Sequence, residues 1–231
     1  MQIVQQTAAV TYDLVVIGAR WKEATGLHWR SARTYELIKS IQPPVLVATG
    51  ERDTLKRFVV CTGGKRYIDD AVQLTGKLAA CVGASVTLLH VAAEPPAIYA
   101  DLVRLEEDVD ALLASGSELG RNLRAQKASL EKLGVSAEVR VRHGLVGDQV
   151  FEEVHAGDHD LIVTGTSQAR GPLRHYIMGD LTRTIVNRTN CPVLVARASA
   201  TGVEGRGGFW SNLKQIFATP AAATADIASR S

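Results

Sequence analysis

An internal repeat constrains this 231-residue chain more than any other feature of its sequence. The letters Pro-Val-Leu-Val-Ala at residues 44–48 recur without change at residues 192–196. A similar stretch precedes each copy: Asp-Leu-Val-Val-Ile-Gly at residues 13–18, and Asp-Leu-Ile-Val-Thr-Gly at residues 160–165. Two matches in the same order, at offsets of 147 and 148 residues, predict a duplicated domain rather than a short-period solenoid.

The two copies are unequal in length. Strand and helix patterns lead into the second copy from residue 58 onward, whereas only residues 1–12 precede the first. We therefore expect residues 1–50 to be the truncated C-terminal part of a first domain. Residues 56–198 are expected to form a complete domain, and the glycine-rich residues 199–231 a flexible tail. The first expected helix begins in the middle of its pattern, so we also expect a coding stretch upstream of Met1.

Short apolar runs alternate with helical patterns through the complete unit. Strands are expected at residues 58–62, 86–91, 137–142, 160–164 and 193–196. Helices are expected at residues 68–82, 98–133 with a break near 115–117, 148–156 and 174–188. This alternation predicts the α/β class, with a five-stranded parallel sheet sandwiched by helices and preceded by a partial β-α-β repeat.

Parallel sheets of this kind bind ligands beyond the carboxyl ends of their strands, and the start of a helix there favours anions. The sequence therefore places a candidate ligand site around the loops that follow the expected strands. The residues expected to line it are Thr62, Gly63, Gly64, Val91, Gly165, Thr166, Arg170, Gly179 and Asp180.

The order Asp-Leu-Ile-Val-x-Gly, a glycine-containing loop, a helix and Cys-Pro-Val-Leu-Val, across residues 160–195, resembles the universal stress protein family. The resemblance covers residues 57–198 and implies an adenine-nucleotide α-hydrolase-like fold and a role in stress adaptation. The partial copy makes the chain similar to a tandem-type member with a truncated first domain. In this family the terminal strand pairs two domains, which implies either a homodimer or pairing of residues 45–47 with residues 193–195 within the chain.

Members of the family that bind ATP carry Gly-x-x-Gly, nine residues and Gly-Ser or Gly-Thr, with an Asp after the first strand. Gly165 and Gly179 match this pattern, whereas Gly63, Gln168 and Asp180 depart from it. A side chain at position 168 blocks a close backbone approach to phosphate, and the Asp180 carboxylate repels it. We expect a regulatory or binding protein with a degenerate nucleotide site and no cofactor. The alternative is an ATP-dependent switch with slow hydrolysis.

The histidines and cysteines show no spacing typical of a metal site or of a nucleophile–base pair. His90 is expected to be a strand-end histidine that has a hydrogen-bond partner, and His155 and His159 to be solvated at a turn. We therefore expect no catalytic residue and no metal. The widely spaced Cys61, Cys81 and Cys191 predict reduced thiols and a cytoplasmic location.

The net charge and the length of the apolar runs indicate whether nucleic acid or a membrane is a partner. A net charge of +2 makes no electrostatic case for nucleic acid, and no apolar run approaches the roughly 18 residues of a membrane-spanning helix. Neither partner is therefore expected. In the tail, residues 209–217 place their apolar side chains on one helical face, which predicts a short amphipathic helix. This helix would dock to a protein partner, fold back on the chain's own domain or fray. Docking to a membrane surface ranks last, because Lys214 alone attracts anionic lipid weakly.

Overall fold

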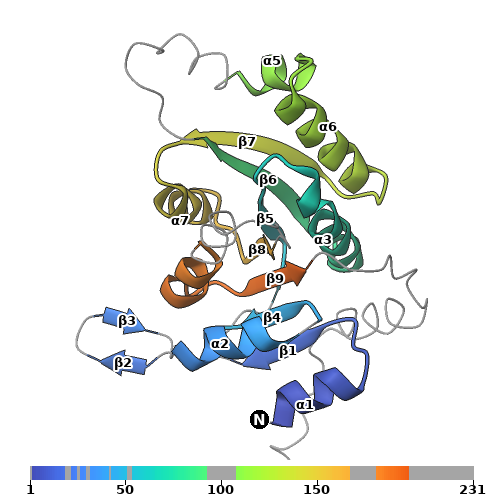
Figure 1. Cartoon of the computed structure of the whole chain (residues 1–231). Coiled ribbons are helices and arrows are strands. Elements are labelled where there is room, and N and C mark those ends of the chain that lie inside the picture. The colour runs from blue at the N-terminus through green and yellow to red at the C-terminus, as the bar shows by residue number, and fades with distance from the viewer. Residues whose placement is uncertain are drawn as a thin grey trace, which may run out of the picture.

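A seven-stranded sheet forms the centre of the computed structural model, with the strand order β1-β4-β9-β8-β5-β6-β7 (Figure 1). The structure describes residues 2–18, 22–24, 27–29, 32–41, 43–50, 54–92, 108–166 and 181–197. The strands of the sheet are β1 (Val15–Gly18), β4 (Val45–Ala48), β5 (Arg57–Cys61), β6 (Ser85–Ala92), β7 (Ala137–His143), β8 (Leu161–Thr166) and β9 (Val193–Arg197).

Helices connect these strands and cover the sheet. They are α1 (Gln2–Ala9), α2 (Ala32–Ser40), the 3-10 turn η1 (Arg66–Ile68), α3 (Asp69–Val82), α5 (Val109–Ala114), α6 (Glu118–Glu131) and α7 (Val146–Ala156). Residues 181–188 are also helical. The chain also forms a separate antiparallel hairpin of β2 (Lys22–Ala24) with β3 (Leu27–Trp29). No helix in the described part of the chain is both long and apolar enough to cross a bilayer.

The five strands expected in the complete unit are confirmed, and all of them run parallel as β9-β8-β5-β6-β7. The expected break near residue 116 is also confirmed. It separates α5 from α6, whose start is capped by the Ser117 hydroxyl, which accepts the N–H of Gly120 at 3.0 Å. The expected helical residues 98–107 and 174–180, and the tail after residue 197, lie outside the described residues.

Two apolar layers sandwich the sheet. One layer joins α3, α5 and α6 to strand residues that include Phe58, Val60 and Val163. The other joins α2, α7 and the helix at 181–188 to strand residues that include Val59 and Ile162. Neighbouring strand residues belong to opposite layers because successive side chains of a strand point to opposite faces. The continuous apolar runs of the sequence are thereby explained, since both faces of the central strands are buried.

The partial copy extends the sheet through an antiparallel pairing of β4 with β9. Leu46 lies opposite Leu194, while Val45 pairs with Val195 and Val47 with Val193. Leu46 and Leu194 occupy the same position of the repeat, so the pairing places a local two-fold axis between the two copies. The expected pairing of residues 45–47 with residues 193–195 within the chain is confirmed. It enlarges the expected five strands to seven.

The two copies also share their internal register. Val15 of β1 pairs with Val45 of β4, and Ile162 of β8 pairs with Val193 of β9. These pairs are equivalent at the repeat offsets of 147 and 148 residues. In each copy a helix precedes the first strand, α1 before β1 and α7 before β8. The sequence repeat is therefore also a structural one.

Candidate functional site

The loops of the expected ligand site gather at one edge of the parallel sheet. Residues 62–64 follow β5, Val91 lies near the end of β6, and Gly165 and Thr166 end β8. Because β8, β5 and β6 are adjacent and parallel, their carboxyl ends meet there. Arg170, Gly179 and Asp180 lie outside the described residues. The structure thus brings together the first six of the nine expected residues.

The loop after β5 is a tight turn built around Thr62 and Gly64. Gly64 has a φ of +66°, in the left-handed region that favours glycine, and a Cβ there would overlap the Leu119 side chain. The Thr62 hydroxyl accepts the N–H of Gly64 at 3.1 Å and donates to Gln126 Oε1 at 3.0 Å. His90 Nδ1 lies 3.1 Å from Thr62 O, so this histidine has a partner at its strand end, as expected.

Helix α6 engages the remaining polar groups of this loop. Asn122 Nδ2 donates to Gly64 O at 2.9 Å, and Gln126 Nε2 donates to Lys65 O at 3.2 Å. The Lys65 ammonium lies 3.0 Å from Glu118 Oε1 in an exposed ion pair. Lys65 therefore has an acidic partner on α6, and the turn is held by side chains of the protein itself.

Gly165 has a packing reason for being glycine. It is buried, and a Cβ there would overlap the Cδ1 atom of Ile68. One residue earlier, the Thr164 hydroxyl lies 2.7 Å from the Thr182 hydroxyl in a buried hydrogen bond. This bond ties the carboxyl end of β8 to the helical residues 181–188. The packing of Gly165 is independent of any approach to phosphate.

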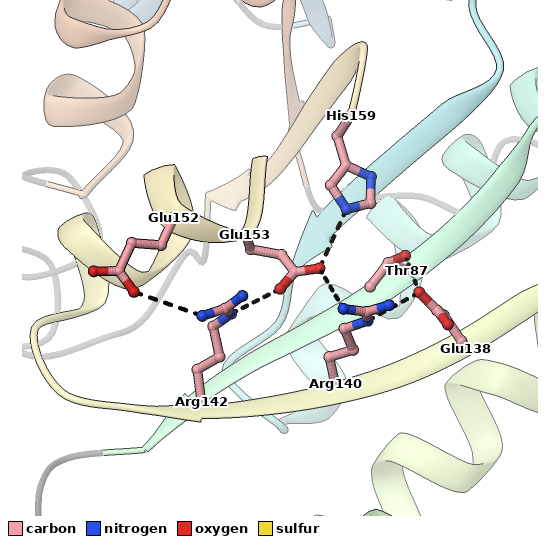
Figure 2. Close-up of polar contacts among 7 residues, drawn as sticks. All are labelled: Thr87, Glu138, Arg140, Arg142, Glu152, Glu153 and His159. Carbon is pink, nitrogen blue, oxygen red and sulfur yellow. Dashed lines mark hydrogen bonds and ion pairs between the residues drawn. The ribbon is translucent and has the colours of Figure 1, made fainter. Parts of the chain in front are cut away.

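A second polar cluster lies under α7 and centres on the fully buried carboxylate of Glu153 (Figure 2). Arg142 Nε donates to Glu153 Oε2 at 2.7 Å, and Arg140 Nη1 lies 3.5 Å from Oε1. His159 Nε2 donates to the same Oε1 at 3.3 Å. Two cations and an imidazole N–H therefore surround one buried carboxylate, which joins α7 to β7 and to the entry of β8.

The cluster continues outward along the sheet (Figure 2). Arg142 Nη1 lies 3.5 Å from Glu152 Oε2, and Arg140 Nε lies 3.1 Å from Glu138 Oε1. The Thr87 hydroxyl on β6 donates to Glu138 Oε1 at 2.9 Å. These partners orient both guanidinium groups toward α7, so the network fastens the helix to β6 and β7.

The expectation that His159 is solvated is wrong, whereas His155 is exposed as expected. After α7 the chain turns at Asp158, which has a φ of +47°, and the N–H of His159 donates back to Val154 O at 3.0 Å. This turn places the His159 ring beneath the helix. The local sequence gave no signal of this burial, although the equivalent positions of the first copy, Gln6 and Tyr12, make an exposed contact in the structure. There Gln6 Nε2 donates to the Tyr12 hydroxyl at 3.1 Å.

Burial by itself raises the pKa of Glu153. Hydrogen bonds from Arg142 and His159 and the charges of Arg140 and Arg142 outweigh it, so the pKa lies below its ordinary value of 4.5. The carboxylate is therefore ionised in the folded protein. Burial also raises the pKa of Cys61 to about 12, which keeps this thiol protonated and unreactive. No group of histidine, cysteine and carboxylate side chains among the described residues is arranged to hold a metal.

Acid is expected to remove the contribution of Glu153 to stability. Because folding lowers its pKa, the stabilisation is complete above pH 4.5 and is lost as the pH falls through the folded value. The difference in free energy of unfolding between the native chain and Glu153→Gln should therefore shrink below pH 4.5. Urea denaturation at a series of pH values measures it. A difference that stays constant down to pH 2 would contradict an ionised, paired Glu153.

Comparisons with known proteins agree with this architecture. The model of the universal stress protein family matches residues 54–197, more than half of the chain. A universal stress protein from Archaeoglobus fulgidus DSM 4304 aligns at 15% identity with a TM-score of 0.55, over 86% of this chain and 65% of that one. A protein of unknown function from Pseudomonas aeruginosa PAO1 aligns at 15% identity and a TM-score of 0.57, over 94% of this chain and 70% of that one.

A universal stress protein in complex with cAMP also matches, at 21% identity and a TM-score of 0.45, over 63% of this chain and 99% of that one. No curated protein gives a significant match to the sequence. The likenesses to the Archaeoglobus and Pseudomonas structures show a shared fold, and the family model covers the whole of the parallel unit from β5 to β9. The chain belongs to the universal stress protein family.

Proposed function

We propose that this chain is a regulatory or binding protein of stress adaptation whose nucleotide site is degenerate. The observation that supports this is the engagement of the loop after β5 by α6. The Thr62 hydroxyl, the carbonyl of Gly64 and the ammonium of Lys65 each have a partner on that helix. A triphosphate that bound the Thr62 hydroxyl or the Lys65 ammonium would have to displace Gln126 or Glu118, while Asn122 holds the Gly64 carbonyl in place.

Three positions at which the sequence differs from the motif of the ATP-binding members support the same proposal. Gly63 is exposed at the end of the first strand of the unit, where the family's ATP-binding members have an Asp. Gln168 and Asp180 replace the second glycine and the hydroxyl residue of the motif. A fixed carboxylate at position 180 would repel phosphate, and the cost grows when the charges are removed from water.

Titration calorimetry of the full chain with ATP tests this proposal. We expect no binding of micromolar affinity by the native chain, and a gain of binding in the triple variant Gly63→Asp, Gln168→Gly and Asp180→Ser. A melting curve of the variant controls for folding. Micromolar binding by the native chain would overturn the proposal.

A second candidate is an ATP-dependent switch with slow hydrolysis. The Thr164–Thr182 hydrogen bond favours it, because it holds the helical residues 181–188 against the carboxyl end of β8, the edge at which parallel sheets bind ligands. The same titration decides between the two functions, and release of phosphate by the native chain would then measure turnover.

We also propose a tandem origin for the architecture. Residues 1–50 would be the truncated part of a first domain, residues 56–198 the complete domain and residues 199–231 a tail that docks a protein partner. The local two-fold relation of β4 to β9 supports this division. On this proposal β4 occupies the place where a second copy would otherwise pair, so the chain forms its domain pair internally. The reduced, widely spaced cysteines support the separate proposal of a cytoplasmic location.

A further inference from the structure

No described strand or helix covers the outer edge of β1, whereas described elements cover the same edge of β8. Among the described residues β1 has one neighbour, β4, whereas β8 lies between β9 and β5. The side chain of Val16 is 59% exposed, while Val163 at the same position of the repeat is fully buried. In the complete copy α3 belongs to the apolar layer that covers Val163. In the described part of the chain, β1 therefore has no counterpart of the strand and helix that pack beside β8.

The carboxylate of Asp13 also differs from its counterpart in the second copy, Asp160. In the complete copy the Asp160 carboxylate accepts the backbone N–H groups of Lys56 at 2.6 Å and Arg57 at 3.1 Å, where the chain enters β5. Asp13 stands at the equivalent position, is exposed, and makes no side-chain hydrogen bond to any residue that the structure describes. Its negative charge is complementary to the two leading N–H groups of a strand entering parallel to β1.

A groove beside this edge provides room for apolar side chains. Helix α1 and the start of β1 line a groove of about 800 Å³, with Ile3, Leu14 and Val16 on its wall. Ile3 is 42% exposed, whereas Val150 at the same position of α7 is fully buried. The difference arises because α7 packs on β6 and β7, which have no counterpart beside α1 in the described part of the chain.

The backbone of β1 is oriented so that some of its hydrogen-bonding groups face the outer edge, where a further strand could pair with them. The N–H of Val15 donates to Pro44 O at 2.9 Å, toward β4. Hydrogen-bonding groups of a parallel strand alternate between its two sides, so those of Leu14 and Val16 face away from β4. An edge strand with unpaired backbone groups and apolar side chains is the template for strand addition.

We propose that the β1 edge binds an extended strand of a separate polypeptide, parallel to β1 and of the same chemistry as β5. Such a strand brings two backbone N–H groups to Asp13 and continues with four apolar residues, as Phe58, Val59, Val60 and Cys61 do beside β8. The alternative occupant is β1 of a second copy, which would lie antiparallel across this edge. That arrangement does not bring the first two N–H groups of a parallel strand to Asp13. The proposal rests on the repeat and is independent of the nucleotide site.

A peptide taken from the chain itself tests this edge. The probe is a fluorescein-labelled peptide of residues 54–66 with Cys61→Ser, titrated with the full-length protein and followed by anisotropy. We expect saturable binding, weakened at least tenfold by Val16→Lys and by Asp13→Ala. The charge-matched control Asp110→Ala, an exposed carboxylate on α5, should leave the affinity unchanged. A peptide with Arg57→Pro, which removes one donor to Asp13, should bind at least tenfold more weakly.

Three results would overturn the proposal. The first is that the peptide fails to bind the native chain, and the second is that it binds the Val16→Lys variant equally well. The third is a native dimer that Val16→Lys converts into a monomer, because a second copy would then cover the edge. Melting curves of Val16→Lys and Asp13→Ala verify that both variants fold. ATP titration of the same samples is a separate measurement, so failure of one proposal is distinguishable from failure of the other.

Discussion

Replacing Glu153 with glutamine is expected to lower the free energy of unfolding by about 3 kcal/mol at neutral pH. The substitution keeps the size of the side chain and removes the charge that Arg142, Arg140 and His159 face. Breaking a buried ion pair costs about 3–5 kcal/mol, and the lower end applies because Arg140 is 47% exposed and keeps part of its hydration. For a chain of this size the expected fall in melting temperature is roughly 6–12 °C.

The neighbouring residue supplies a matched control. Glu152 lies on the same helix and contacts the same Arg142 at 3.5 Å, but its side chain is 60% exposed. Glu152→Gln should cost less than about 1 kcal/mol, because exposed ion pairs contribute little. Differential scanning calorimetry of both variants checks the contrast. Equal losses would mean that burial of the carboxylate is not what makes the cluster stabilising.

Removing the carboxylate of Asp160 should cost about 2–3 kcal/mol. Its two oxygens accept the N–H groups of Lys56 and Arg57, and Asp160→Ala leaves both donors without that acceptor at the start of a central strand. Hydrogen bonds to charged groups are worth about 1.5–3 kcal/mol each, and water admitted to the partly buried site recovers some of the loss. Urea denaturation monitored by circular dichroism measures the difference.

The repeat again provides the control. Asp13→Ala removes the same chemical group from the equivalent position of the first copy, where the carboxylate is exposed. Its effect on stability should stay within about 0.5 kcal/mol, as for other surface substitutions. A loss as large as that of Asp160→Ala would show that Asp13 already anchors backbone in the isolated chain. The β1 edge would then not be open.

Much of the fold could be predicted because periodicity and repetition are local properties of the chain. The apolar runs around Val60, Leu88 and Ile162 have the length and composition of strands buried on both faces, and all three lie in the parallel unit. The pairing of residues 45–47 with residues 193–195 followed from the repeat combined with the resemblance. The hairpin β2–β3 was missed, since its short strands lie among residues that carry no alternating apolar pattern.

The candidate site was less predictable. Gly165 was expected from a motif, but the structure gives it a packing contact with Ile68, which lies 97 positions earlier in the sequence. Likewise, nothing in the local sequence indicates that Gln126, more than 60 residues after Thr62, would bond to its hydroxyl. Contacts between distant segments depend on how helices pack on the sheet, and sequence spacing does not record this packing.

The sequence by itself determined the class of fold, the order in which strands and helices follow one another in the parallel unit, and the repeat shared by residues 13–48 and 160–196. Hydrophobic period and literal repetition need no knowledge of long-range contacts. Only the tertiary structure decided that His159 is buried against Glu153, that α6 holds the loop after β5, and that no described element covers the β1 edge. Each of these depends on which surfaces meet in space. Burial, which sets the cost of a charge and the exposure of a strand edge, is a property of that arrangement.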